Sequence, residues 1–369
     1  MPDFDQYRPP GYERRYRGDK KKKGNGPRKK RGAGAQDGTR EERMAMDFEF
    51  ANYYGQPVVK APPWEWPIGV YFWLGGIGGG SALLGAGAQA TSNKPLLRTT
   101  RLTSIVAAGL GSAFLILDLG RPERFYNMFR VFKASSPMNM GSWLLGGFSG
   151  AAAVAAASEA AEMTKNVLPL PNVVHRVLHT AAGPAGIVSA VLGGPLAGYT
   201  AVLIADTSNP TWNGAKKHLP YVFVASASLA SAGTAMITTP VANAGPARAL
   251  ALAGVAGDLA MVRVMEDNME PEHVKHLKEG KPGKLMKASE YLAIAGGVGT
   301  ALASVTKSRA VSVVAGGCLA AASLCTRLGV LEGGLESAKD PEATIGPQKR
   351  RAEARLRDSG LTNSVITPK

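Results

Sequence analysis

The chain has 369 residues and a formal net charge of +15, with 43 Lys and Arg against 28 Asp and Glu. Its two cysteines, Cys318 and Cys325, exclude a disulfide framework, and no Cys/His spacing suits zinc or an iron–sulfur cluster. We therefore predict no metal site. The mean hydropathy of −0.04 is that of a soluble protein, but it averages polar ends with a middle rich in Ala, Gly, Leu and Val.

Residues 1–62 form a basic N-terminal segment. Lys and Arg crowd the interval from Arg8 to Arg31, where the only acids are Glu13 and Asp19. No apolar core follows directly, so the segment is not a cleavable signal peptide. Its composition predicts a disordered tail that holds the N-terminus in the cytoplasm and touches anionic lipid. An arm that binds nucleic acid is the less favoured reading of the same charge, and we expect no nucleic-acid partner.

Eight apolar windows follow in series, each a candidate membrane-spanning helix. Three of them, 102–117, 291–306 and 310–326, have only 16, 16 and 17 residues, fewer than the roughly 20 that a spanning helix needs. These three reach a full span only if the flanking Arg101, Asp118, Glu290 and Arg327 lie at the membrane interface. The windows are residues 66–93, 102–117, 134–158, 177–205, 219–239, 246–265, 291–306 and 310–326.

A soluble helical bundle is the competing fold. It would need helices with one polar face, but these windows are apolar all round. Their many Gly, Ala and Ser residues favour close helix packing in lipid instead. We therefore predict an all-α, polytopic membrane protein. An eight-transmembrane-helix bundle over 63–332 is followed by a polar C-terminal tail over 333–369.

Eight crossings put both termini on one side of the membrane. Loops on the N-terminal side (118–133, 206–218, 263–288) carry more Lys and Arg than the opposite loops, and the basic tail strengthens the bias. Positive charge favours the cytoplasm, so both termini are expected there.

The same parity gathers a polar and aromatic cluster on the cytoplasmic face. It contains Glu65 and Trp66 before the first span, Asp118 after the second, and Trp212 before the fifth. Tyr71 and Tyr199 should lie roughly 8–10 Å below this face, because a helix rises 1.5 Å per residue. Two phenols at matching depth could hydrogen-bond a molecule that enters from the lipid. An ordinary interfacial aromatic belt is the alternative.

Two acids fall within or beside the spans. Asp118 and Arg121 are three residues apart, so they share a helix face and can pair. That pair is either a cap that fixes topology or a proton-handling group beside an arginine-rich rim. Asp258 lies inside the sixth window, where an acid is a functional hypothesis by default, although Arg263 could neutralise it.

Four segments resemble the NrfD/PsrC family, the integral-membrane subunits of molybdoenzyme-linked, quinone-reactive oxidoreductases. They occur in the family's order and spacing and cover most of the first five spans. The later spans agree in hydropathy alone, and the basic tail is an extension. The segments are WEWPIGVYFWLGGIGGG (64–80), LDLGRPERFYNMFR (117–130), SPMNMGSW (136–143) and YTAVLIADTSNPTWNG (199–214).

The resemblance implies a membrane anchor that passes electrons between an iron–sulfur partner and the quinone pool. The expected partners are a ferredoxin-like iron–sulfur subunit and a molybdopterin catalytic subunit, as in polysulfide reductase or formate-dehydrogenase-like complexes. The expected exchangeable ligand is menaquinone or ubiquinone, with no haem, iron–sulfur cluster or molybdopterin held by this protein. Quinone contacts are expected at Tyr71, Tyr199, Asp118, Arg121 and Trp66, proton exchange at Asp118 and Glu65, and partner docking at Arg121, Arg124, Arg130 and Trp212.

Two other classes of function compete with this one. A purely structural membrane anchor would have the same spans but no quinone site. A secondary transporter would also have internal acids, but it typically shows inverted repeats and polar groups near the midplane. The polar groups here gather at one face, which favours the quinone-linked subunit.

Overall fold

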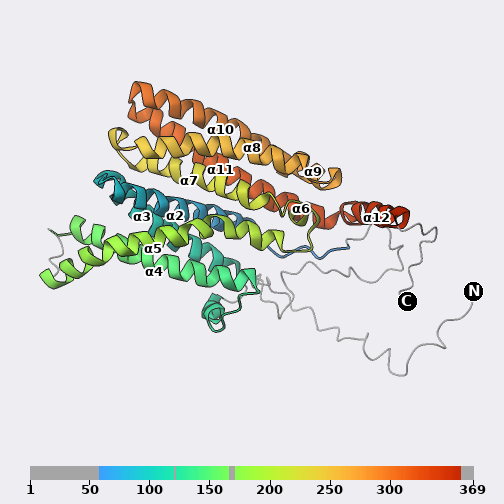
Figure 1. Cartoon of the computed structure of the whole chain (residues 1–369), viewed down its shortest axis with the longest axis horizontal. Helices are drawn as coiled ribbons and strands as arrows, with labels where there is room; N and C mark the ends of the chain where they lie inside the picture. Colours follow the sequence, from blue (N-terminus) through green and yellow to red (C-terminus); the bar gives the residue numbers. More distant parts are fainter. Residues whose placement is uncertain (1–57, 120–121, 166–170, 359–369) are drawn as a thin grey trace, which may run out of the picture. The chain divides into compact units, whose positions relative to one another are not determined.

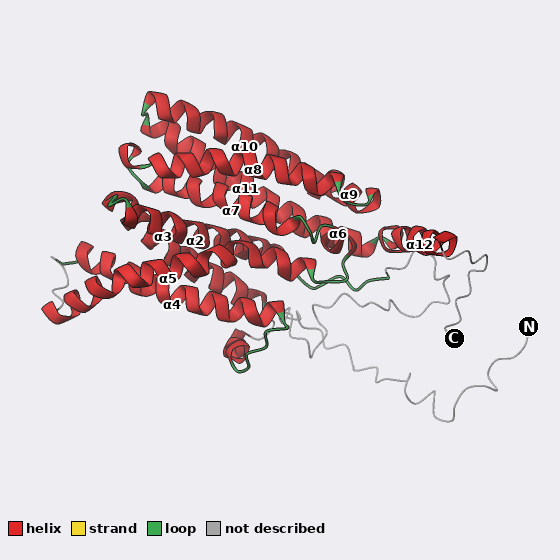
Figure 2. Cartoon of the chain, in the orientation of Figure 1, coloured by secondary structure: helices red, strands yellow, loops and turns green. Residues whose placement is uncertain are grey.

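The computed structural model describes residues 58–119, 122–165 and 171–358, and within them every regular element is a helix (Figure 2). The basic tail over 1–57 and the residues Gly120 and Arg121 lie outside this description. Eight helices are long. They are α2 (Trp66–Ala90), α3 (Lys94–Asp118), α4 (Pro137–Met163), α5 (Asn172–Ala205), α7 (Leu219–Thr238), α8 (Gly245–Asp267), α10 (Gly280–Thr306) and α11 (Arg309–Lys339).

Short helices connect or follow the long ones. They are the 3-10 helices η2 (Pro122–Phe129) and η3 (Val241–Asn243), and the α-helices α6 (Pro210–Gly214), α9 (Pro271–Lys278) and α12 (Pro341–Asp358). Many helices begin at a proline in their first turn, where its missing N–H costs nothing. Ser136 also caps α4, because its hydroxyl accepts a hydrogen bond from the backbone N–H of Asn139.

The long helices pack as two groups that are joined mainly through α2. Helices α2 to α5 contact one another, and α7, α8, α10 and α11 form the second group (Figure 1). Helix α2 joins the groups, since it also packs on α7 and α11. Its most apolar window is 83% buried, against 33% in α3. Helix α2 is therefore the core of the molecule.

Glycines on α2 make this central position possible. Gly79 crosses Gly193 of α5 so closely that a side chain on Gly79 would overlap the Gly193 carbonyl. A Cβ on Gly76 would lie 3.1 Å from the Cβ of Ala227 on α7. Small residues at helix crossings are typical of membrane bundles. The predicted all-α membrane class is confirmed.

Six of the eight long helices are long and apolar enough to cross a membrane. Helices α8 and α10 are more polar and do not meet the same standard. With 23 and 27 residues they are about 34 and 40 Å long, which exceeds a hydrocarbon core of about 30 Å. The count of eight crossings stays a prediction.

Several helices extend beyond the predicted windows. Helix α3 begins at Lys94 and α11 continues to Lys339. The predicted windows were shorter because they stopped at charged residues, whereas the helices continue through them. The polar C-terminal segment is helical as far as Asp358.

Two arginines expected at the interface are buried instead. Arg101, whose side chain is 9% exposed, donates hydrogen bonds to Glu159 and Gln89 at 2.9 Å. Arg327 is fully buried, and its Nη2 donates to the carbonyl of Phe223 at 2.6 Å. Neither residue is at a helix end, because α3 begins at Lys94 and α11 continues to Lys339, and both side chains pack inside the protein.

The partner of Asp258 also differs from expectation. Arg263 is highly exposed and pairs with Glu290 at 3.4 Å, so it does not neutralise Asp258. The cation whose charge acts on Asp258 is Arg327, which comes from α11. Asp258 is 2% exposed. Asp258 of α8 and Arg327 of α11 are thus a buried acid and a buried base whose charges influence each other without a direct hydrogen bond or ion pair.

Candidate functional site

Alternating helix directions bring four helix ends together at one end of the first group. The start of α2, the end of α3, the start of α4 and the end of α5 meet there, as the packing of α2 on α3, α3 on α4 and α4 on α5 requires. The resemblance-derived residues at this end therefore share a face, as the sequence predicted.

Tyr71 lies inside the bundle, five residues after the start of α2 and so about 8 Å along its axis. Its side chain is 2% exposed and packs beside Phe72, with ring centroids 5.9 Å apart. The phenol Oη makes no hydrogen bond to any described residue. A buried polar group without a partner costs about 1–3 kcal/mol, so Tyr71 presents a donor that a ligand could satisfy.

Tyr199 lies six residues before the end of α5, about 9 Å along its axis. Its half-buried ring rests on Gly141 of α4 so closely that a methyl group there would overlap ring atom Cε2. Tyr199 also packs against the apolar cluster that contains Tyr71, Leu145 and Phe148. The two tyrosines thus lie at matching depth in one cluster. Gly141 was not singled out from the sequence, where one glycine among many gives no signal.

The other predicted ligand contacts surround this cluster. Trp66 is 58% exposed, and its ring meets that of Phe114 edge to face at 5.9 Å. Asp118 is half-buried as the last residue of α3, and Glu65 is exposed just before α2. Arg121, the predicted partner of Asp118, lies outside the described residues, so that pairing stays a prediction.

The segment after α3 forms an exposed, basic and aromatic surface. Helix η2 presents Arg124, and Arg130 follows it, both exposed. Asn139 fixes this segment to α4, because its Nδ2 donates to the Val131 carbonyl at 2.8 Å and its Oδ1 accepts from the Lys133 backbone at 2.6 Å. We call this the η2 surface. Its large exposed side chains are Phe125, Tyr126, Phe129, Val131, Phe132 and Trp143.

Trp212 does not belong to that surface. It is fully buried, stacks on Trp64 with centroids 5.6 Å apart, and donates from Nε1 to the Val330 carbonyl at 2.8 Å. Its ring also lies against Gly334, where no larger residue would fit. The expected docking role of Trp212 is corrected: it anchors α6 to α11 and has no surface to offer a partner.

The amino-acid sequence matches the family described as "Polysulphide reductase, NrfD" over residues 56–265. It is also similar to the C subunit of the polysulfide reductase of Wolinella succinogenes, with 31% identity over 84 residues. That similarity extends over 21% of this protein and 26% of the relative. The family match spans more than half of the sequence and includes Tyr71, Asp118, Gly141 and Tyr199. The chain is an integral membrane protein and belongs to the NrfD family.

Proposed function

We propose that this protein is the quinone-interacting membrane subunit of an oxidoreductase complex. Electrons pass between an iron–sulfur partner subunit on the η2 surface and a menaquinone or ubiquinone near Tyr71 and Tyr199. The observation that carries the proposal is the buried phenol of Tyr71, which lacks a hydrogen-bond partner among the described residues and lies in the same cluster as Tyr199.

A bound quinone would supply a two-electron carrier whose carbonyl oxygens accept hydrogen bonds. The phenols of Tyr71 and Tyr199 fit this chemistry, because each can donate one hydrogen bond. Trp66, exposed beside Phe114, lies at the start of α2, where a lipid-soluble molecule could contact it from the lipid. The surrounding apolar cluster excludes water from the hydroxyl group of Tyr71.

Proton exchange falls to the acids at the same end. Asp118, half-buried at the end of α3, exchanges the proton that accompanies each electron, and the exposed Glu65 is the second candidate for this role. An acid or base in this role must come within hydrogen-bond reach of the oxygen that it serves.

Partner docking is assigned to the η2 surface. Exposed aromatic and arginine side chains are enriched in protein interfaces, and this surface combines both with a loop fixed by Asn139. The Wolinella relative is one lettered subunit of a polysulfide reductase, and its name supports a complex of several subunits. We propose a ferredoxin-like iron–sulfur subunit and a molybdopterin subunit as partners.

The orientation is also proposed. Exposed Lys133, Lys216 and Lys217 lie at the same end as the η2 surface, and the basic N-terminal segment precedes α2 on that end. The positive-inside rule places this end in the cytoplasm of a bacterial cell. The partner subunits would then dock from the cytoplasm.

Substitution of the two tyrosines tests the function. Tyr71→Phe and Tyr199→Phe each remove one hydroxyl group, and we expect electron transfer to quinone in the purified complex to fall about tenfold, as the loss of one hydrogen bond predicts. Partner retention should be unchanged. Tyr221→Phe is the matched control, because Tyr221 is 62% exposed on α7. Unchanged quinone turnover in both variants would contradict the quinone site and would favour a purely structural membrane anchor.

A further inference from the structure

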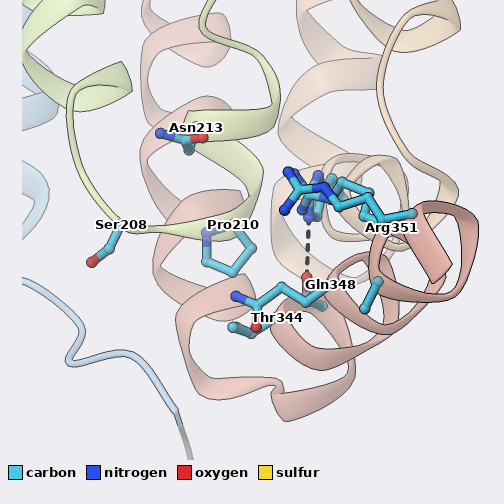
Figure 3. A pocket seen from close by; sticks show the side chains of 10 residues that line it. Ser208, Pro210, Asn213, Thr344, Gln348 and Arg351 are labelled. Atoms are coloured by element: carbon cyan, nitrogen blue, oxygen red, sulfur yellow. Dashed lines mark hydrogen bonds between the residues drawn. The ribbon is translucent and has the colours of Figure 1, made fainter. Parts of the chain in front are cut away.

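A separate cavity lies between α6, α9 and α12, away from the tyrosine cluster. Its volume is about 510 Å³, which is the size of a small-molecule site. Figure 3 shows Pro210 of α6 beside Gln348 and Thr344 of α12, which line the cavity together. The polar lining residues are Ser208, Asn213, His273, Thr344, Gln348, Arg351 and Arg355.

The walls of this cavity are fixed by ion pairs between α9 and α12. Arg350 of α12 binds Glu270 at 2.9 Å and Glu272 at 2.7 Å, and its hydrogen bond holds the pKa of Glu272 down to about 2. His276 and Asp340 pair at 2.9 Å nearby. These pairs hold α12 against α9, so the cavity does not need a bound ligand to keep its shape.

Two of the lining residues, His273 and Thr344, each contain a buried polar atom that has no partner among the described residues. His273 is 7% exposed, and its Nε2 lies 3.0 Å from the Ala343 carbonyl, so Nε2 must donate (dashed line in Figure 3). In the neutral ring Nδ1 is then an acceptor, and it bonds to no described residue. The hydroxyl of Thr344, which is 9% exposed, bonds to none of them either. Such groups are costly unless a ligand completes them.

The rim of the cavity is positively charged. Arg351 and Arg355 both line it, and its described lining contains no Asp or Glu. The Nε of Arg351 donates to the Pro347 carbonyl at 3.1 Å, which orients the guanidinium and leaves its other N–H groups free for a ligand. Two guanidinium groups at one cavity suit an anion with several oxygens.

We propose that this cavity binds a phosphate group, carried either by an anionic lipid headgroup or by a soluble phosphate compound. Arg351 and Arg355 hold the phosphate oxygens, and Thr344 donates from its hydroxyl group. His273 completes the site by binding a proton at Nδ1 and donating a hydrogen bond from it to a phosphate oxygen.

The test uses the full-length protein in phosphatidylcholine nanodiscs and radiolabelled inorganic phosphate. Arg351→Gln with Arg355→Gln should weaken saturable phosphate binding at least about tenfold, since each removes a charged hydrogen bond. The matched control is Lys349→Gln with Arg357→Gln, which removes the same charge from exposed positions outside the lining. The phosphate affinity of this control variant should stay within about twofold of that of the unmodified protein. Thr344→Val provides a second lining variant should the double variant unfold.

Discs that contain phosphatidylglycerol distinguish the two sources. If that lipid competes with phosphate, and the lining variant loses the competition, the native ligand is a lipid headgroup. If phosphate binds equally in both kinds of disc, the ligand is soluble. Equal weakening in the lining and control variants would overturn the proposal. The proposal would also be overturned if phosphate showed no saturable binding and if Arg351→Gln with Arg355→Gln left the retention of phosphatidylglycerol unchanged.

Sulfate, whose charge is constant above about pH 3, tests the role of His273. Burial lowers the pKa of His273, while Glu270 and Glu272 raise it and Arg351 lowers it. A bound anion favours the protonated ring, so sulfate should bind at least about threefold tighter at about pH 5.5 than at about pH 7.5. His273→Gln should remove this difference. A pH dependence that survives in His273→Gln would contradict the assignment.

Discussion

The position of Tyr199 depends on a glycine in the neighbouring helix. The ring occupies the space where a Gly141 side chain would lie. We predict that Gly141→Ala displaces the ring by about 1 Å and lowers electron transfer to quinone roughly 10- to 100-fold, as misplacement of a ligand-positioning group does. Quinone reduction by the assembled complex measures this.

Gly150 of the same helix provides the control for that substitution. A Cβ at Gly150 meets nothing within 4 Å, so Gly150→Ala should leave quinone turnover unchanged. Equal losses in the two variants would show that any alanine in α4 disturbs the complex. Normal turnover in Gly141→Ala would show that the ring position of Tyr199 is irrelevant to the reaction.

The sequence predicted some residues better than others. The depths of Tyr71 and Tyr199 follow from helix rise and from the ends of two helices, which apolar windows mark well. The burial of Trp212 could not be predicted, because its hydrogen bond reaches Val330, 118 positions away. Gly141 and Arg327 were missed for the same reason: contacts between distant helices determine what they do.

Between elements, the buried acid Asp258 of α8 lies within the electrostatic influence of the buried base Arg327 of α11. Arg327 is enclosed by Phe223, whose ring centroid lies 3.9 Å from its Cζ, and by α2 at Gly76. We predict that Arg327→Met alone destabilises the protein by about 3–5 kcal/mol, because it leaves the Asp258 carboxylate buried without its cation. Thermal unfolding of the detergent-solubilised protein measures the loss.

A double-mutant cycle separates this cause from lost packing. Asp258→Asn combined with Arg327→Met should cost clearly less than the sum of the two single substitutions, since no charge is then buried alone. Arg263→Met, at an exposed pair with Glu290, should change stability by at most about 1 kcal/mol. Strict additivity in the cycle would refute a coupling between Asp258 and Arg327.

The positions of helices were predicted well where apolar composition alone determines that a helix forms. The six apolar helices coincide with predicted windows, although their polar ends extend further. Helices α9 and α12 were not predicted, since short polar helices form here by ion pairs such as that of Arg350 with Glu272. Pairing between α9 and α12 across about 80 positions leaves no periodic pattern in the sequence.

At the scale of the whole molecule, charge is expected to set the orientation. If eight helices cross the membrane, both termini lie in the cytoplasm with the η2 surface. A green fluorescent protein fused after Lys369 should then fluoresce, and an alkaline phosphatase fused at the same place should be inactive. The reverse pattern would show that α8, α10 or another long helix does not cross, or that the complex faces outward.

The central claim is that quinone binds between the start of α2 and the end of α5. Photolabelling of the assembled complex with an azidoquinone, followed by peptide mapping, tests it most directly. The account predicts labels in the first two turns of α2, the first turns of α4 and the last two turns of α5, reduced by excess quinone and by Gly141→Ala. Labels confined to α7, α8, α10 or α11, or to the opposite ends of α2 and α5, would contradict it.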